Sequence, residues 1–355
     1  MRKPLLSSLF AASLAAALAL PVNAEKKDQF DVCWTIYAGW MPWEYGAAQG
    51  IVDKWADKYG IEIKVTQLND YVESINQYTA GQFDGCTMTN MDALTIPAAG
   101  GVDSTALIVG DFSNGNDGVV IKGEKKTLGD LKGMEVNLVE LSVSHYLLAR
   151  GLERAGLAEK DLKVVNTSDA DLVAAFATDD VQAVATWNPL LAEIAATPKV
   201  TKVFDSSQIP GEIIDLMVVN SDTLKDNPEL GKALTGAWYE IMATMSADSA
   251  EGIAAREHMA KASGTDLAGY EAQLAATKMF YSAKDAVAFV NSPKLPATMT
   301  KVAEFSFAHG LLGEGAQSAD AIGMAFAKGV TTGDKGNLKL RFDPSYMQMA
   351  ADGKL

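Results

Sequence analysis

Four segments of the chain place aromatic or acidic side chains directly after an apolar, strand-like stretch. The first is YAGWMPWEYG, which begins at Tyr37, follows FDVCWTIY and holds Trp40, Trp43 and Glu44. Aromatic faces stack on planar cations, and carboxylates accept their hydrogen bonds. This segment therefore predicts binding of a small, flat, positively charged molecule. The alternative is that both tryptophans pack in the core while Glu44 stabilises the positive end of a helix.

The second segment, TMTNMDA, carries Asn90 and Asp92 between a predicted strand and a predicted helix. Side chains of these types cap helices, because their oxygens accept hydrogen bonds from the first free backbone N–H groups. The same oxygens point toward the end of the strand, where a ligand would lie. Both a capping role and a binding role fit Asn90 and Asp92, and one residue can fill both.

The third segment, NLVELSVSHYLL, places Glu140 just before a predicted helix that starts near Ser142. A bare helix start attracts anions, because its backbone N–H groups carry partial positive charge. A carboxylate at that position would repel an anionic ligand, so the segment argues against nitrate or sulfonate. Alternatively, Glu140 points to solvent, Ser142 only caps the helix, and His145 packs on it.

The fourth segment, ATWNPLL, ends a predicted strand with Trp187, which we expect to face Trp43 across a cleft. The alternative for Trp187 is a place in a hydrophobic core. Asp215 interrupts the apolar stretch EIIDLMVV, and a carboxylate there is costly unless it meets a donor or a cation. We therefore expect Asp215 to face the cleft, whereas Asp117, in NGNDG, is expected to be a turn residue.

The elements that position these residues follow an α/β pattern. Strand-like and helix-like stretches alternate from residue 31 to 113, where the turn cluster SNGNDG interrupts the alternation. The alternation resumes and continues to residue 220. Helical patterns then continue to about residue 328, and a polar tail follows. Such alternation favours parallel sheets covered by helices. It predicts two lobes, 25–115 with 217–355 and 116–216, joined by two hinge-like crossings and closed by a C-terminal helical segment. A generic α/β enzyme fits the pattern as well.

Charge and the N-terminus limit the classes of partner. The 355 residues carry a formal net charge of −15, which argues against nucleic acid and anionic membrane surfaces. Residues 1–24 have two basic residues, an apolar run and a small-residue exit, the pattern of a cleaved signal peptide. Removal of this signal peptide would leave a net charge of −17. The protein would then lie outside the cytoplasm.

The two cysteines, Cys33 and Cys86, lie on predicted strands. In an oxidising compartment they can form a disulfide, although a bond between parallel neighbours is sterically awkward; two buried thiols are the alternative. No cysteine cluster suits a metal or an iron–sulfur centre, and we expect no metal or cofactor.

A family resemblance is carried by FDGCTMTNMDALTIPAAG and GVDSTALIVGDFSNGNDGVVI together with the order of elements. These resemble periplasmic substrate-binding proteins of nitrate/sulfonate/taurine-type ABC importers. YAGWMPWEYGAAQGIVDKWADKYGI and VATWNPLLAEI resemble most the branch associated with urea (guanidine) carboxylase. The resemblance implies the type II periplasmic binding protein fold, a cleft that closes on a small solute, and delivery to the transmembrane subunits of an ABC permease. It also implies a periplasmic location, and we expect a monomer.

Residues and resemblance together predict a binding protein for guanidine. A guanidinium ion offers five or six N–H donors to carboxylates, and no arginine or lysine stands at the four strand ends. Urea has the same shape without the charge and is the alternative, followed by another small nitrogen or sulfonate solute. An enzyme of the pyrimidine-synthesis type is disfavoured, because its cysteine-rich segment is missing and the three histidines are scattered. A solute sensor would need the same pocket and hinge.

Overall fold

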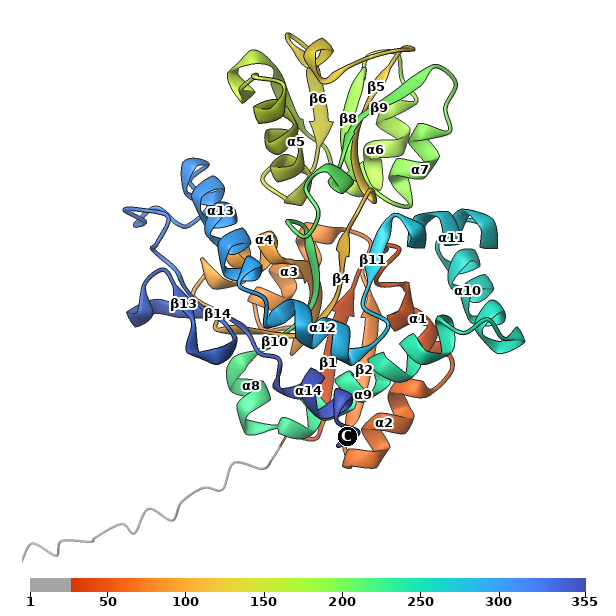
Figure 1. The fold of residues 1–355 in the computed structure, drawn as a ribbon, viewed down its shortest axis with the longest axis vertical. Helices are drawn as coiled ribbons and strands as arrows, with labels where there is room; N and C mark the ends of the chain where they lie inside the picture. The colour runs from red at the N-terminus through yellow and green to blue at the C-terminus, as the bar shows by residue number, and fades with distance from the viewer. Residues whose placement is uncertain (1–26) are drawn as a thin grey trace, which may run out of the picture.

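The computed structural model describes residues 27–355, so the predicted signal peptide, residues 1–24, lies outside the described residues. The chain forms two sheets, each covered by helices, and the two resulting lobes stand one above the other in Figure 1. Lobe 1 comprises residues 27–113 and 214–355, and lobe 2 comprises residues 117–205. Segments 114–116 and 206–213 cross between them. Within residues 27–355, no helix combines the length and apolar character that a membrane crossing needs.

Lobe 1 is built on a nine-stranded mixed sheet. In sheet order its strands are β13 (Thr331–Thr332), β12 (Gly323–Ala325), β14 (Leu338–Phe342), β4 (Ser104–Ser113), β10 (Ile214–Asn220), β3 (Gly85–Thr89), β1 (Gln29–Trp34) and β2 (Glu62–Gln67), with β11 (Thr277–Met279) paired to β4. Its helices are α1 (Met41–Ala48), α2 (Ile51–Tyr59), α3 (Tyr71–Thr79), α4 (Asn90–Ala93), the π-helical η1 (Leu94–Ala98), α8 (Ser221–Asp226), α9 (Pro228–Met245), α10 (Ala250–Ala262), α11 (Leu267–Ala275), α12 (Ala283–Val290), α13 (Lys294–Ala308) and α14 (Ser345–Ala351), with the short turns η5 (Ala327–Gly329) and η6 (Lys335–Asn337).

Lobe 2 is smaller and follows the same plan. Its five strands, in sheet order, are β7 (Lys163–Asn166), β6 (Glu135–Leu138), β8 (Ala183–Trp187), β5 (Asp117–Lys122) and β9 (Val200–Asp205). Its helices are α5 (Val143–Arg154), α6 (Asp169–Phe176) and α7 (Leu190–Ala195), with the short turns η2 (Leu128–Leu131), η3 (Glu159–Asp161) and η4 (Ser206–Gln208) at its edges and exit.

Local sequence signals account for many element ends. Pro42 lies in the first turn of α1, where its missing N–H costs nothing. Gly60 ends α2 with a φ of 68°, a left-handed conformation that glycine adopts without a Cβ penalty. Asp70 caps α3 by accepting a hydrogen bond from the Glu73 backbone N–H. These signals fix where the loops at the strand ends begin, and those loops carry the site.

Two features of the fold differ from the sequence-based prediction. Asp215 and Leu216 belong to β10, which pairs antiparallel with β3 and β4 in lobe 1, so the second crossing ends before Ile214 rather than after Leu216. The segment expected to be a polar tail contributes β14, which extends the sheet beside β4. Its apolar residues alternate at Leu338, Leu340 and Phe342, the period of a strand with one buried face.

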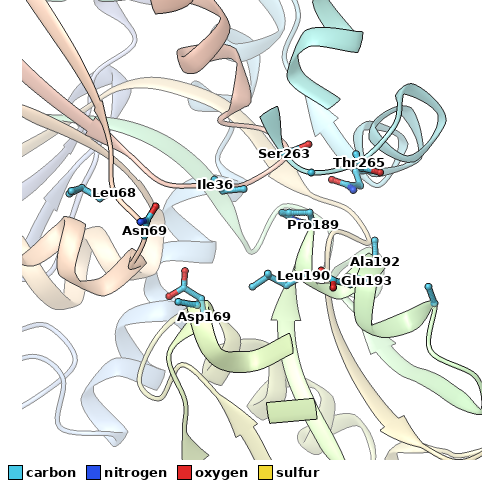
Figure 2. A pocket seen from close by; sticks show the side chains of 14 residues that line it. Ile36, Leu68, Asn69, Asp169, Pro189, Leu190, Ala192, Glu193, Ser263 and Thr265 are labelled. Carbon is cyan, nitrogen blue, oxygen red and sulfur yellow. The ribbon is translucent and has the colours of Figure 1, made fainter. Parts of the chain in front are cut away.

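An open groove separates the lobes on one side (Figure 2). From lobe 1 it is lined by Ile36, Leu68 and the Ser263–Thr265 turn, and from lobe 2 by Asp169, Pro189, Leu190 and Glu193. Ser168 Oγ donates to Asp70 Oδ2 over 3.0 Å at its edge, which holds the lobes together there.

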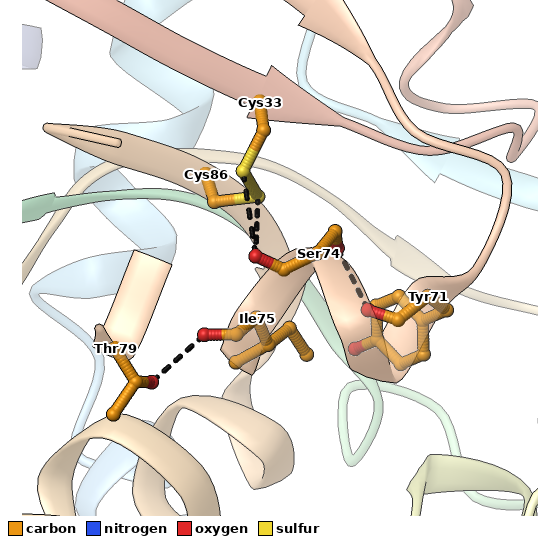
Figure 3. The surroundings of a disulfide bond; sticks show 6 residues. All are labelled: Cys33, Tyr71, Ser74, Ile75, Thr79 and Cys86. Atoms are coloured by element: carbon orange, nitrogen blue, oxygen red, sulfur yellow. Dashed lines mark hydrogen bonds between the residues drawn. A yellow bond between two sulfur atoms is a disulfide. The ribbon is translucent and has the colours of Figure 1, made fainter. Parts of the chain in front are cut away.

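Cys33 and Cys86 form a disulfide, although both alternatives were open from the sequence. They are direct partners in the parallel β1–β3 pair, with Cα atoms 4.4 Å apart, and both are fully buried. The Ser74 carbonyl oxygen lies 3.6 Å from Cys33 Sγ (Figure 3). The disulfide therefore joins the adjacent strands β1 and β3 of lobe 1, and its sulfurs pack against the backbone of α3.

Candidate ligand-binding site between the lobes

A small chamber of about 10 Å³, with room for about one water molecule, lies where the two lobes meet. Its lining residues are Tyr37, Trp40, Tyr71, Thr89 and Asp215 from lobe 1 and Asp117, Val143 and Trp187 from lobe 2. Each of these residues is at most 5% exposed. Both lobes therefore contribute walls, and the chamber exists only while they are closed on each other.

The strand ends of both lobes deliver the lining residues. Tyr37 and Trp40 lie in the loop between β1 and α1, and Thr89 is the last residue of β3. Asp117 opens β5 and Trp187 ends β8, and these two residues are direct partners across the antiparallel pair. Ligands of α/β sheets bind outside such carboxyl ends, so the position is the expected one for a binding site.

Aromatic rings make a continuous wall. The Tyr37 and Trp40 rings meet edge to face at 5.0 Å between centroids, and the Trp40 and Tyr71 rings lie 5.8 Å apart. Tyr71 in turn meets Trp187 of lobe 2 edge to face at 5.5 Å. The Trp40 Nε1–H is buried and has no hydrogen-bond partner within residues 27–355.

Acidic side chains make the rest of the polar surface. Asp215 lies opposite Asp111, its partner on β4, and the Tyr37 hydroxyl donates to Asp111 Oδ1 over 3.1 Å. Oδ2 of Asp111 and Oδ2 of Asp215 have no hydrogen-bond partner among the described residues. Burial raises the pKa of Asp111 and the pKa of Asp117 each to about 7. Burial, reinforced by the charges of Asp111 and Asp117, raises the pKa of Asp215 well above its usual value.

Asp92 lies behind the aromatic wall and holds it in place. Its Oδ2 accepts hydrogen bonds from the Tyr71 hydroxyl at 2.7 Å and from Thr89 Oγ1 at 2.8 Å. Burial raises the pKa of Asp92 to about 6, and the backbone N–H of Val143 from lobe 2 works against that rise. Asp92 thus positions two lining residues and also meets the start of α5.

None of the eight lining residues that the structure describes is arginine, lysine or histidine. Desolvated carboxyl groups without a cationic partner are unfavourable in their charged form. A positively charged guest would supply that partner. An anion would meet buried acidic groups instead. The carboxyl groups of the chamber thus have no cationic side chain beside them among the lining residues.

The structure brings four of the ten predicted site residues to the chamber and leaves the other six outside its lining. Tyr37, Trp40, Trp187 and Asp215 line it. Trp43 instead stacks on Trp238 at 5.2 Å in the core of lobe 1, so it does not face Trp187. Glu44 pairs with His258, at 2.8 Å between Oε2 and Nε2, on the far side of α1. Both positions match the structural alternatives weighed for these residues.

The remaining predicted residues have structural contacts. Asn90 clamps the second crossing, because its Nδ2 donates to the Glu212 carbonyl and its Oδ1 accepts from the Ile214 N–H at 2.9 Å. Glu140 is exposed to solvent. Ser142 caps α5, with its Oγ accepting from the Ser144 N–H. Because Glu140 is exposed, it gives no reason to exclude an anionic ligand. The buried aspartates of the chamber are the acidic groups that bear on this question.

Four lining residues, Tyr71, Thr89, Asp117 and Val143, were not among the predicted site residues. Tyr71 follows the strand β2 at a fifth strand end, where a tyrosine at the start of an amphipathic helix carries no special signal. Asp117 was expected to be a turn residue, but it opens β5 and turns toward the chamber. Val143 reaches the chamber only through closure of lobe 2 on lobe 1.

Comparisons with known proteins agree with this architecture. Residues 55–251, more than half of the chain, match the model of the NMT1/THI5-like family. A binding protein of Brucella abortus (strain 2308) is 24% identical over 181 residues, which cover 50% of this chain and 56% of that protein. The taurine-binding periplasmic protein of Escherichia coli (strain K12) is 24% identical over 144 residues, 39% of this chain and 44% of that protein. The chain thus spans about half the length of these curated relatives.

Solved structures show the fold. The alkanesulfonate-binding protein of Xanthomonas axonopodis pv. citri, bound to MOPS, aligns with a TM-score of 0.65 at 17% identity, over 82% of this chain and 96% of that one. The nitrate-binding protein of Synechocystis PCC 6803 aligns with a TM-score of 0.57 at 13% identity, over 94% and 100%. These matches confirm the predicted two-lobed periplasmic binding protein fold. The family match and the architecture lead to one conclusion: the chain belongs to the NMT1/THI5-like family.

Proposed function

We propose that this protein is an extracytoplasmic solute-binding protein that captures guanidinium in the chamber and delivers it to the transmembrane subunits of an ABC permease. The observation that carries the proposal is the closed chamber with aromatic walls and the buried aspartates 117 and 215, with Asp111 behind them. The relatives' names support the class of protein, a periplasmic binding protein. The choice of ligand rests on the chamber alone.

Electrostatics separates this chamber from one for sulfonate, taurine or nitrate. Two unit charges about 4 Å apart interact by about 4 kcal/mol at the effective dielectric of a protein surface. In their ionised forms, Asp117 and Asp215 would oppose an anion by amounts of this order and would favour a cation by the same amounts. The chain is thus proposed to share the fold of sulfonate binders while binding a guest of the opposite charge.

Shape restricts the cation further. Rings of Trp40, Tyr71 and Trp187 provide faces and edges for a flat guest, and each good contact of a cation with an aromatic face contributes about 1–2 kcal/mol once water is excluded. Asp117, from lobe 2, and Asp215, from lobe 1, would accept hydrogen bonds from the N–H groups of the guest. Because the lining residues are almost completely buried, a long substituent such as the chain of arginine has no exit from the closed chamber.

Closure of the two lobes depends on the same lining residues. Lobe 1 supplies most of the chamber, and lobe 2 adds Asp117 and Trp187, so a bound cation is enclosed only when the lobes come together about the two crossings. The ligand therefore stabilises the closed form, which the permease would recognise. In this proposal the protein acts as a periplasmic monomer, carries out no reaction, and needs no cofactor.

Urea is the second candidate, and one observation favours it. The buried Trp40 Nε1–H has no partner among residues 27–355, and a urea carbonyl oxygen could accept its hydrogen bond, whereas guanidinium offers no acceptor. Aspartic acids that keep their protons could donate to the same oxygen. Against urea stands the charge of the chamber, since a neutral guest leaves the acidic groups without a cationic partner.

Calorimetric titration of the mature chain with guanidinium, urea, taurine and nitrate tests the proposal. We expect guanidinium to bind at least about tenfold more tightly than urea, a difference of about 1.4 kcal/mol, with no heat from nitrate or from taurine, a zwitterion that carries a sulfonate group. Tight binding of taurine or nitrate would reject the acidic chamber as the binding site. Equal binding of urea and guanidinium would favour the second candidate.

A further inference from the structure

Two buried serines join the two crossings between the lobes. Ser113 is the last residue of β4 in lobe 1, and Ser206 opens the turn η4, directly after β9 of lobe 2. Their Oγ atoms lie 2.6 Å apart, and both side chains are fully buried. Because one serine ends a strand of lobe 1 and the other follows a strand of lobe 2, this hydroxyl pair lies at the hinge.

Backbone N–H groups of the first crossing bind to the same two hydroxyl groups. The Gly115 N–H donates to Ser206 Oγ over 2.8 Å. The Asp117 N–H donates to Ser113 Oγ over 3.1 Å and lies 3.4 Å from Ser206 Oγ. Gly115 has a φ of 118°, a backbone conformation that favours glycine. The turn that directs these N–H groups toward the serines therefore depends on a glycine at this position.

The carboxyl group of Asp117 interacts with the serine pair as well. Burial raises the pKa of Asp117 to about 7, and a hydrogen bond with the Ser113 side chain works against that rise. A hydroxyl group lowers the pKa of a carboxyl group by donating to its ionised form. The Ser113 hydroxyl thus donates to the carboxyl group of Asp117, which lines the chamber.

These contacts determine where the hydrogens of the pair lie. A serine hydroxyl donates one hydrogen bond and can accept two. Because the hydrogen of Ser113 goes to Asp117, the hydrogen between the two serines belongs to Ser206. Ser113 Oγ then accepts from Ser206 and from the Asp117 N–H, while Ser206 Oγ accepts from the Gly115 N–H. The hydrogen bonds therefore run from the second crossing, through Ser113, to a carboxyl group of the chamber.

We propose that Ser113 and Ser206 are positioning residues for the ligand, and that their hydroxyl pair orients the carboxyl group of Asp117 toward the chamber when the lobes are closed. Neither serine is among the residues that line the chamber, so both act through Asp117. Because the serines belong to different crossings, rotation of lobe 2 about the hinge moves one relative to the other. Recognition of the guest is thereby coupled to closure. The inference rests on the proposed function, which gives Asp117 its role.

A purely structural role of the serines would have different consequences. Serine hydroxyls at turns commonly bind neighbouring backbone groups, and loss of such a contact lowers stability. It does not by itself change the titration of a carboxyl group. The binding of the ligand and the pKa of Asp117 are therefore the two properties that separate a positioning role from a structural one.

Calorimetric titration of the mature chain with guanidinium chloride tests the first property. We expect Ser113→Ala and Ser206→Ala each to lower the affinity by about three- to tenfold, the effect of one hydrogen bond. The double variant should bind no more than about twofold more weakly than the weaker single variant, because the two hydroxyls act as a unit. The matched control is Ser221→Ala, which breaks the 2.8 Å hydroxyl pair with Thr105 inside lobe 1 and should bind like the wild type.

The second property is measured without a ligand. The carboxyl ¹³C shift of Asp117, followed by NMR as a function of pH, gives the pKa of this group. We expect Ser113→Ala to raise that pKa above the wild-type value, because the hydroxyl that stabilises the ionised form is lost, and Ser221→Ala to leave it unchanged. The other titratable groups that interact with Asp117 are the same in each variant; they are Tyr37, Asp92, Asp111 and Asp215.

The two measurements also separate this inference from the proposed function. If the wild type binds guanidinium, an unchanged affinity in both single variants would overturn the inference. An Asp117 pKa that does not rise in Ser113→Ala would overturn it in any case. If the wild type does not bind guanidinium, the proposed function fails, and the pKa measurement alone decides whether Ser113 holds the carboxyl group. Thermal unfolding verifies that each variant is folded at the temperature of the measurements.

Discussion

Asp111 and Asp215 lie directly opposite each other on the neighbouring strands β4 and β10, and both are buried beside the chamber. Burial raises the pKa of both carboxyl groups, and the charge of Asp111 adds to the rise at Asp215, whereas the hydrogen bond with Asp215 lowers the pKa of Asp111. A bound cation would place a positive charge beside this pair.

Replacing Asp215 by asparagine should weaken guanidinium binding strongly. The substitution keeps the size of the side chain and removes its charge, and loss of one member of a buried charge pair costs about 2–5 kcal/mol of binding free energy, or about 30-fold or more in affinity. Stability should be unchanged or higher, because a strained buried carboxyl is removed. Calorimetry and thermal unfolding measure the two effects. Glu44→Gln, outside the chamber, is the control, and an unaltered affinity in Asp215→Asn would place the ligand elsewhere.

The two tryptophans Trp187 and Trp43 should behave differently when each is changed to leucine. Trp187 lines the chamber, so Trp187→Leu should reduce guanidinium affinity by about tenfold, the value of one cation–π contact. Trp43 packs on Trp238 in the core, so Trp43→Leu should lower the thermal unfolding temperature with little change in affinity. Calorimetry on the folded variants separates the cases. The reverse result would restore the sequence-based prediction for Trp43.

Guanidinium affinity should rise with pH between about 5 and 7. Asp111 and Asp117 have pKa values of about 7 in the closed, empty chamber, and the cation binds best to their ionised forms. Each proton released on binding gives up to a tenfold rise in affinity per pH unit below the pKa. Titrations across this range provide the check. An affinity independent of pH would be the behaviour of urea.

Stability of the empty protein should show the opposite trend. Burial raises the pKa of Asp111 and of Asp117 above the usual value, so the folded state binds more protons than the unfolded state between about pH 4 and pH 7. The contribution of these groups to the free energy of unfolding therefore falls as pH rises through that window. Calorimetric thermal unfolding should show that fall reduced in Asp117→Asn; an equal fall in variant and wild type would assign it to other groups.

Loss of the disulfide should destabilise lobe 1. The two cysteines are 53 residues apart, and a loop of that length corresponds to about 4 kcal/mol in the chain-entropy account. The double variant with alanine at Cys33 and Cys86 should unfold at a clearly lower temperature. Heat is the appropriate denaturant, because urea and guanidinium are both candidate ligands. Unchanged thermal unfolding would show that the bond is not needed for stability.

The sequence was a good guide to the fold because its periodicity is local. Alternating strands and helices, the turn cluster before Asp117 and the capping residues all reflect nearest neighbours in the chain. Register against the neighbouring strand is not local. For this reason the end of the second crossing was placed three residues late, and β14 was missed in a segment dominated by polar residues.

The candidate site was harder to derive from the sequence, for a related reason. The loop after β1 was expected to hold aromatic residues near the cleft, but which of its two tryptophans faces the chamber depends on where α1 begins. Trp40 precedes the helix and points to the chamber, whereas Trp43 lies within its first turn and faces the core. Asp117 resembles an ordinary turn residue until its partner Trp187 is known. Contacts that form only when the lobes close leave no local pattern in the sequence.

A crystal structure of the mature protein grown with guanidinium tests the central claim most directly. The account predicts a planar guest in the closed chamber, next to the Trp40 and Trp187 rings, with its N–H groups within hydrogen-bond distance of Asp117 and Asp215. An empty chamber with guanidinium bound elsewhere, or a sulfonate or nitrate ion seated against those two aspartates, would contradict it.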